Sequence, residues 1–300
     1  MSKKILKKLV VACCVSVMTA SILGGCGKTV SEDKKATSSE SKKEQKSAIL
    51  VVSFGTSYND SRNITIGGIE SAIREAHPGC DVRRAFTSQI IIDKLKKRDG
   101  IEIDNVKQAL QRAQKDGVTD LTIVPTHLMS GFEYSDVKKD VKKYGKGIKS
   151  VVVGEPLLSK DEDYTKLANI LSEKYKKYDD GETAICFMGH GTEAKSNETY
   201  AKFQNVFTSL GKENFFVGTV EAKPSVDDLI AKIKANPKYK KVVIMPLMVV
   251  AGDHANNDMA GDEPDSWKSK FTAQGYEVTC VLEGLGQDYN VQQMYVNKIK

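Results

Sequence analysis

Short apolar runs alternate with longer amphipathic stretches from residue 48 to the end of the chain. Apolar runs of about four to eight residues bounded by turn residues are typical of buried strands, and apolar positions three and four residues apart are typical of helices. The predicted strands are residues 48–53, 81–86, 121–124, 150–153, 183–188, 214–217, 241–245 and 277–282. The predicted helices are residues 60–76, 89–98, 104–116, 164–178, 197–210, 225–235, 263–273 and 287–299. This alternation indicates an α/β fold whose parallel sheets are covered on both faces.

The order of elements and several short motifs occur twice. Residues 52–57, VSFGTS, parallel residues 188–193, MGHGTE. A predicted strand followed by Pro125 and Gly131 likewise parallels one followed by Pro246 and Gly252. The repetition predicts two similar Rossmann-like lobes, residues 48–158 and 159–300, with an active-site cleft between them. Because ligands of open α/β sheets bind beyond the carboxyl ends of the strands, functional residues are expected in the loops that follow the strands.

The first 47 residues differ in composition from the rest. A segment with four lysines precedes an apolar stretch, and this stretch is shorter than the roughly 20 residues of a membrane span. It ends in small residues before Cys26. The arrangement predicts a signal peptide over residues 1–25. It also resembles a bacterial lipobox, which implies lipid attachment at Cys26; an ordinary signal peptide followed by an unrelated cysteine is the alternative.

Residues 26–47 are rich in Lys, Ser and Glu and contain almost no large apolar side chain. Such a segment cannot bury enough surface to offset the entropy lost on ordering, so it predicts a disordered tether. Together with the signal, the tether leads us to expect an exported protein that is lipid-anchored on the outer side of the cytoplasmic membrane or lies in the periplasm.

The charge argues against a nucleic-acid partner, and the cysteine spacing argues against a disulfide framework or a C-x-x-C metal site. The formal net charge is +6, and removal of residues 1–25, which hold four lysines and no acid, lowers it to +2. The densest basic cluster, residues 94–98, is typical of a solvated helix face, so no nucleic-acid partner is expected. The cysteines after the N-terminal segment are too widely spaced for a disulfide framework or a C-x-x-C metal site: Cys80, Cys186 and Cys280. The sequence leaves the oligomeric state open and is compatible with a homo-oligomer.

Three loops of the second half each carry one potential metal ligand. His190 lies between two glycines after one predicted strand, Glu221 follows the next, and His254 follows the strand after that. Imidazole and carboxylate groups suit first-row divalent metals. At the corresponding positions of the first half stand Phe54 for His190 and Glu133 for His254, so we expect one metal site per chain. Spacing of this size is not a motif, and histidines in loops are usually ordinary packing or surface residues.

Five motifs together resemble the anaerobic sirohydrochlorin cobalt chelatases, relatives of the ferrochelatases among the class II chelatases. The longest and most specific is the last, MPLMVVAGDHANNDM. The resemblance covers about residues 48–295, and most proteins of this kind resemble cytoplasmic enzymes, so the predicted export signal is a departure. The motifs are residues 49–57, 125–134, 188–192, 220–224 and 245–259.

The resemblance implies an activity and a ligand set. It implies insertion of a divalent metal, Co²⁺ first and Fe²⁺, Ni²⁺ or Zn²⁺ as alternatives, into sirohydrochlorin during anaerobic cobalamin or tetrapyrrole biosynthesis. By motif the metal ligands fall on His190, Glu221 and His254. His190 is the expected proton acceptor, because imidazole exchanges protons near neutral pH, and Glu221 is expected to orient a histidine or carry protons.

The carboxylates of such a tetrapyrrole require polar partners at the rim of the cleft. The candidates are Ser57, Tyr58 and Arg62, which are equally suited to turn and helix-cap roles, and His127, which could instead be a packing residue. His77, beside Pro78-Gly79, is expected to be an ordinary surface or packing residue. Two other functions stay open: a lipid-anchored solute-binding protein that carries a metal or tetrapyrrole, and a chelatase for iron or nickel.

Overall fold

The fold consists of two four-stranded parallel sheets in residues 45–299, the part of the chain that the computed structural model describes. The first sheet has the strand order β2-β1-β3-β4 and the second β6-β5-β7-β8. The predicted α/β class with two similar lobes is therefore confirmed. The strands are β1 (Ser47–Ser53), β2 (Asp81–Phe86), β3 (Asp120–Pro125), β4 (Ser150–Val153), β5 (Thr183–Gly189), β6 (Phe215–Thr219), β7 (Lys241–Pro246) and β8 (Glu277–Cys280).

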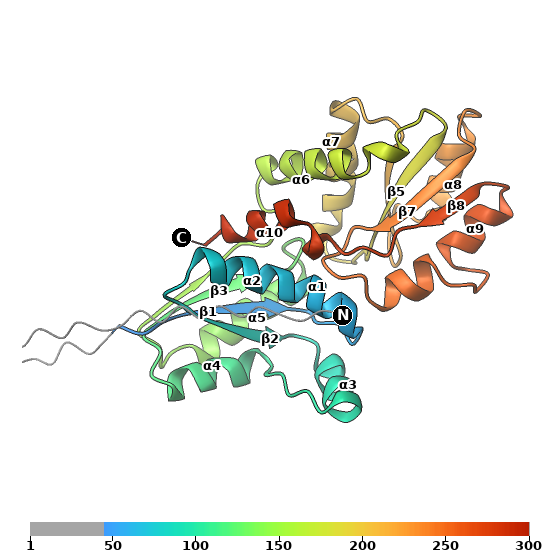
Figure 1. Ribbon diagram of the computed structural model, residues 1–300. Coiled ribbons are helices and arrows are strands. Elements are labelled where there is room, and N and C mark those ends of the chain that lie inside the picture. Colours follow the sequence, from blue (N-terminus) through green and yellow to red (C-terminus); the bar gives the residue numbers. More distant parts are fainter. Residues whose placement is uncertain (1–44, 300) are drawn as a thin grey trace, which may run out of the picture. The chain divides into compact units, whose positions relative to one another are not determined.

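Helices connect the strands and cover the sheets (Figure 1). The α-helices are α1 (Asn59–Ile64), α2 (Ile66–Ala76), α3 (Gln89–Asp99), α4 (Val106–Lys115), α5 (Phe132–Tyr144), α6 (Asp161–Lys174), α7 (Glu198–Ser209), α8 (Val226–Lys234), α9 (Trp267–Ala273) and α10 (Tyr289–Val296). The 3₁₀ helices are η1 (Lys176–Tyr178), η2 (Lys195–Asn197) and η4 (Leu285–Gln287), and η3 (Ala255–Met259) is a π-helix. No helix of residues 45–299 is long and apolar enough to cross a membrane. The predicted signal peptide, Cys26 and nearly all of the predicted tether lie outside the described residues.

Two predicted helices differ from the structure in their bounds, and one helix was not predicted. The helix predicted over residues 60–76 is interrupted at Thr65, where α1 ends and α2 begins. The helix predicted from residue 263 begins only at Trp267, after Ser266, whose hydroxyl accepts a hydrogen bond from the Ser269 N–H and caps α9. Helix α5 was not predicted, because only Tyr134 and Val137 of its thirteen residues are buried and apolar periodicity is therefore weak.

The alternation of side chains along the central strands explains how each sheet is covered on both faces. Ile49 and Val51 of β1 point into a core cluster with α2, whereas Leu50 points into another cluster with α4 and α5. In the second sheet, Phe187 of β5 packs with α6 and α7, and Cys186 packs with α8 and α9. Two-sided burial accounts for the nearly continuous apolar runs of these strands.

One core cluster joins the two sheets. It contains residues of β1 and α2 beside the first sheet and residues of β5, α6 and α7 beside the second. It also contains Val291, Met294 and Tyr295 of α10. Figure 1 shows α10 beside α2, although α10 comes last in the chain. The buried Tyr295 hydroxyl of α10 donates a hydrogen bond of 2.9 Å to the carbonyl oxygen of Thr126, which directly follows β3. Residues 45–299 accordingly belong to one compact unit.

Candidate metal centre

Three strands of the second sheet end beside one another, and each is followed by a side chain that could bind a metal ion. His190 follows β5, Glu221 follows β6 and His254 lies in the loop after β7. Each residue offers one ligand atom, and these atoms all lie within 4.8 Å of one another. The His190 and His254 rings are 4.6 Å apart between centroids and nearly perpendicular. The fold thus brings together three residues that are 31 to 64 positions apart in the sequence.

Backbone hydrogen bonds fix the first two loops against each other. The Val220 N–H donates to the Gly189 carbonyl at 3.0 Å, and the Glu221 N–H donates to the His190 carbonyl at 2.9 Å, so the parallel ladder continues past the strand ends. Gly191 has φ of +90°, and a Cβ atom there would lie 2.8 Å from the Ala222 nitrogen. Only glycine fits this turn, and the turn leaves the His190 side chain about half exposed.

The hydrogen bonds of the two histidines determine which ring nitrogen is free. His190 Nδ1 lies 2.8 Å from the Gly191 carbonyl oxygen, which can only accept, so Nδ1 must carry the proton. His254 Nδ1 lies 2.7 Å from Oδ2 of Asp258, and an ionised carboxylate likewise only accepts. A neutral imidazole that carries its proton on Nδ1 has its lone pair on Nε2, so Nε2 is the atom that each ring can offer to a metal. This is the arrangement found at metal sites, where the second ring nitrogen of a ligating histidine is bonded to a carbonyl or carboxylate.

The π-helix η3 places Asp258 beside His254. His254 is the N-cap residue of η3, and the Asn256 side-chain amide closes the turn by donating to the Gly252 carbonyl at 2.7 Å. Asp258 was missed in the sequence analysis. Its only signal was its spacing of four residues from His254, which on a helical turn puts two side chains on one face.

The first sheet has the same strand register as the second and the same pairing of the loops after its first two strands, but different side chains. Val52 of β1 pairs with Pro125 as Met188 of β5 pairs with Pro246, which makes Phe54 the counterpart of His190. The Ser88 N–H donates to the Phe54 carbonyl at 3.2 Å, so Ser88 is the counterpart of Glu221. The same register makes Glu133 the counterpart of His254. Among the described residues, the only group of three potential metal ligands is the one in the second lobe.

The loop after β1 and the start of α1 contact the loop after β7. The Ala251 N–H donates to the Ser61 hydroxyl at 3.1 Å, and the Tyr58 hydroxyl lies 3.4 Å from Oδ1 of Asp253. Burial, followed by the negative charge of Asp253, raises the pKa of Tyr58. A Cβ atom at Gly252 would lie 3.2 Å from Oγ1 of Thr56. The loop after β1 therefore lies against the loop that carries His254.

The residues predicted to bind substrate carboxylates lie in different environments. Tyr58 is at the contact with the His254 loop, but the side chain of Ser57 is buried. Arg62 is only 4% exposed and donates to Oδ1 of Asn59; burial and then the neighbouring charge of Arg84 lower its pKa. Arg62 thus offers almost no surface to a ligand.

His127 is the fourth of these predicted substrate-binding residues. Its side chain is 8% exposed, and neither of its ring nitrogens has a hydrogen-bond partner among the described residues. Its Nε2 atom lies 3.4 Å from Oε2 of Glu133. His127 therefore borders the first turn of α5, and the structure does not group it with His190 and His254.

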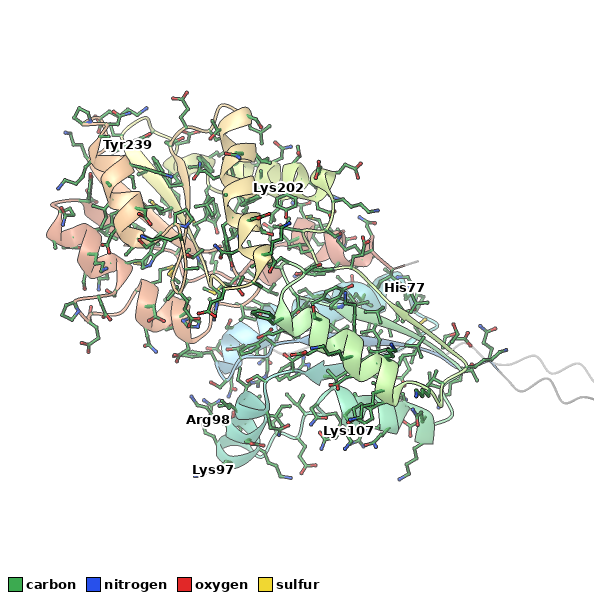
Figure 2. All side chains as sticks on the ribbon, turned by 180° about the vertical axis from the view of Figure 1, so that it is seen from behind. His77, Lys97, Arg98, Lys107, Lys202 and Tyr239 are labelled. Atoms are coloured by element: carbon green, nitrogen blue, oxygen red, sulfur yellow. The ribbon has the colours of Figure 1, made fainter. Side chains whose placement is uncertain are left out.

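The basic cluster predicted to be a solvated helix face is exposed on α3. Figure 2 shows Lys97 and Arg98 on the outside of this helix. Arg98 forms ion-pair and hydrogen-bond contacts with Asp99 and with the Ser57 carbonyl. His77, also labelled in Figure 2, is the C-cap residue of α2 and is not part of the metal centre.

Comparison with known proteins identifies relatives over most of the chain. The family model described as cobalt chelatase (CbiK) matches residues 47–300. Sirohydrochlorin cobaltochelatase of Salmonella typhimurium is 40% identical over 251 residues, which are 84% of this chain and 94% of that protein. Sirohydrochlorin cobaltochelatase CbiKC of Nitratidesulfovibrio vulgaris is 31% identical over 244 residues, 81% of this chain and 85% of that protein.

Solved structures share the fold at low sequence identity. SirB from Bacillus subtilis, solved with Fe³⁺, has a TM-score of 0.58 at 13% identity and covers 85% of this chain and 94% of its own. CbiX, described as the terminal enzyme of siroheme biosynthesis in denitrifying bacteria, has a TM-score of 0.51 at 14% identity and covers 84% of this chain and 97% of its own. The two-lobed α/β architecture is therefore that of known chelatases.

Proposed function

The chain belongs to the cobalt chelatase (CbiK) family, and on this premise we propose that it inserts Co²⁺ into sirohydrochlorin, a step of cobalamin biosynthesis. The observation that carries the proposal is the convergence of His190, Glu221 and His254 at three adjacent strand ends, with their ligand atoms within 4.8 Å. The free Nε2 atoms of the histidines and the Glu221 carboxylate form the ligand set for the incoming ion. Imidazole and carboxylate are suitable donors for cobalt, and the same donors accept iron, nickel and zinc.

The reaction joins Co²⁺ to four ring nitrogens and releases two protons from them. His190 and His254 hold the ion through Nε2, and their Nδ1–H groups remain bonded to Gly191 and Asp258, which keeps both rings oriented. As the ion passes to the macrocycle, Nε2 of His190 becomes free to accept a proton, because imidazole serves as a base near neutral pH. Glu221, whose Oε2 is 3.7 Å from His190 Nδ1, is exposed to solvent and carries protons away.

An absorbance time course tests this proposal. Sirohydrochlorin and Co²⁺ are mixed with a catalytic amount of the chain from residue 45 onward, beside the His190→Ala variant and a His77→Ala control. We expect many equivalents converted by the unmodified protein and by the control, and a loss of more than about 100-fold in the variant, the scale of losing a general base. Conversion of at most one equivalent would instead identify a binding protein, and faster conversion with Fe²⁺ or Ni²⁺ would reassign the metal.

We further propose that the chain is exported and anchored by lipid at Cys26. The support is the sequence alone: a basic segment, an apolar stretch and small residues precede this cysteine in order. A lipid-anchored protein should label with radioactive palmitate in bacterial cells and sediment with the membrane fraction. The Cys26→Ser variant should lose the label and appear in the soluble fraction. Label that persists in the variant, or unlabelled protein in the cytosol, contradicts the anchor.

A further inference from the structure

Phe54 is a large apolar side chain that is 48% exposed at the end of β1. It occupies the place in the first lobe that His190 occupies in the second. Gly55, which follows it, has φ of +100°, as Gly191 has φ of +90° after His190. A Cβ atom at Gly55 would lie 2.5 Å from the Phe86 ring, so this turn too requires glycine. The same backbone turn therefore displays a phenyl ring in one lobe and a metal-binding imidazole in the other.

The loop that begins with Phe54 lies against the metal centre of the other lobe. Thr56, two residues after Phe54, packs on Gly252, two residues before His254. A few residues further, Tyr58 approaches Asp253 and Ser61 binds the Ala251 N–H. Phe54 is thus the exposed aromatic side chain of the loop whose next residues contact the His254 loop.

Two other exposed apolar side chains extend the same edge of the first sheet. Ile90, 81% exposed, follows β2, and Phe132, 64% exposed, follows β3. Because β1 lies between β2 and β3 in the sheet, Phe54 lies on the strand end between theirs. Gly131, which precedes Phe132, also lies near the second lobe, because a Cβ atom there would be 3.8 Å from Oγ of Ser196. One edge thus carries apolar side chains and the other carries the metal ligands.

We propose that Phe54 packs against the face of the tetrapyrrole that is turned away from the metal ligands; this rests on the function proposed above. A tetrapyrrole has two flat, conjugated faces and carries its carboxylates around the rim. A phenyl ring gains contact with such a face through apolar burial and offset or edge stacking. It has no metal-binding atom, so it holds the macrocycle without competing for cobalt. In this proposal the first lobe contacts the macrocycle, and the second lobe binds the metal ion and accepts protons.

The Phe54→Ala variant tests this contact. We expect KM for sirohydrochlorin to rise about tenfold, the change that one aromatic contact supports, with a smaller change in kcat. The affinity for Co²⁺ alone, measured by calorimetry, should stay as in the unmodified protein. Phe54→Trp should retain a KM near the original value because it preserves the aromatic face. Ile64→Ala is the control, since Ile64 is 52% exposed on the same lobe but lines a hollow beside Arg74 and Arg84.

Binding of sirohydrochlorin without metal, followed by its absorbance, separates this inference from the proposed activity. If the unmodified protein binds the ring but does not turn over, the proposed activity fails while the Phe54 contact is still measured by the titration. Equal ring affinity in Phe54→Ala and Ile64→Ala would overturn the contact. So would a loss of Co²⁺ affinity in Phe54→Ala with unchanged ring affinity, because Phe54 would then act on the metal centre instead.

Discussion

The carboxyl edges of the two sheets have the same strand order and register but carry different side chains. Strand order, register and the positive-φ glycine after the first strand are the same in both lobes. In the second lobe the three corresponding positions hold His190, Glu221 and His254. The first lobe holds a side chain that cannot bind a metal, a hydroxyl and a single carboxylate at those positions: Phe54, Ser88 and Glu133.

This difference shows that the fold supplies converging positions and the side chains supply the chemistry. Parallel strands end at one edge, so residues far apart in the sequence meet there in both lobes. Metal binding needs suitable donor atoms at all three positions, and the first lobe has a carboxylate at only one of them. The duplicated scaffold can therefore carry two unlike surfaces, and substitutions at corresponding positions should have unlike effects.

The largest contrast is expected between His254→Ala and Glu133→Ala, which change corresponding positions. His254→Ala removes a proposed metal ligand, so Co²⁺ affinity should fall by more than about 100-fold. This exceeds the roughly 10- to 100-fold loss typical of replacing a residue that only hydrogen-bonds to a ligand. Glu133→Ala should leave Co²⁺ affinity unchanged, because the group of three potential metal ligands found in residues 45–299 does not include Glu133, whose Oε2 lies 3.4 Å from Nε2 of His127. Calorimetric titration with Co²⁺ measures both. Similar losses in the two variants would mean that the first lobe also holds metal.

The sequence predicted most of this architecture because the strands are buried on both faces. Every residue of β5 is buried, and a continuous apolar run of that kind is visible without a structure. Helix α5 escaped prediction because its lysines face solvent and few of its residues enter the core. The interruption at Thr65 also escaped, since apolar residues continue on both sides of it.

For the candidate site, the sequence named the three residues that the fold brings together as a potential metal site, but not the residues that orient them. His190, Glu221 and His254 stand out because each follows a predicted strand. Asp258 does not stand out, because an aspartate in a loop is common. Neither does Tyr200 of α7, whose buried hydroxyl accepts a hydrogen bond from the Gly191 N–H, because a tyrosine in a helix is common. The contact of Asp258 with His254 depends on a π-helix, and the contact of Tyr200 with the His190 loop depends on the packing of α7. No local sequence pattern predicts either feature.

A smaller effect is expected when Asp258 is replaced by asparagine. The Asp258 carboxylate accepts the Nδ1–H bond of His254 at 2.7 Å and makes the imidazole a better donor at Nε2. Asp258→Asn keeps the size but removes the charge, so Co²⁺ affinity should fall by about 10- to 100-fold. The matched control is Asp262→Asn, since Asp262 pairs with Lys268 at the surface and touches neither histidine. An unchanged affinity in Asp258→Asn would show that the carboxylate does not tune the ligand.

The smallest effect is expected at Tyr200, which is hydrogen-bonded to the loop that carries His190. Its buried hydroxyl accepts a hydrogen bond from the Gly191 N–H at 3.2 Å. Tyr200→Phe leaves that N–H without its partner, which should lower the free energy of unfolding by about 1–3 kcal/mol in urea titration. Co²⁺ affinity should change little, because the metal ligands themselves remain in place.

The pH dependence of that loss identifies its cause. Burial raises the pKa of Tyr200, although the hydrogen bond from Gly191 acts in the opposite direction. A raised pKa means that the folded protein favours the neutral phenol, so this contribution is complete below about pH 10, the ordinary pKa of tyrosine, and is lost as the pH rises further. The difference between wild type and Tyr200→Phe should therefore be constant from pH 6 to 9 and shrink above about pH 10. A difference that varies between pH 6 and 9 would point to another titrating group. The loss of the Tyr200 hydroxyl would then not be the sole cause of the lower stability of Tyr200→Phe.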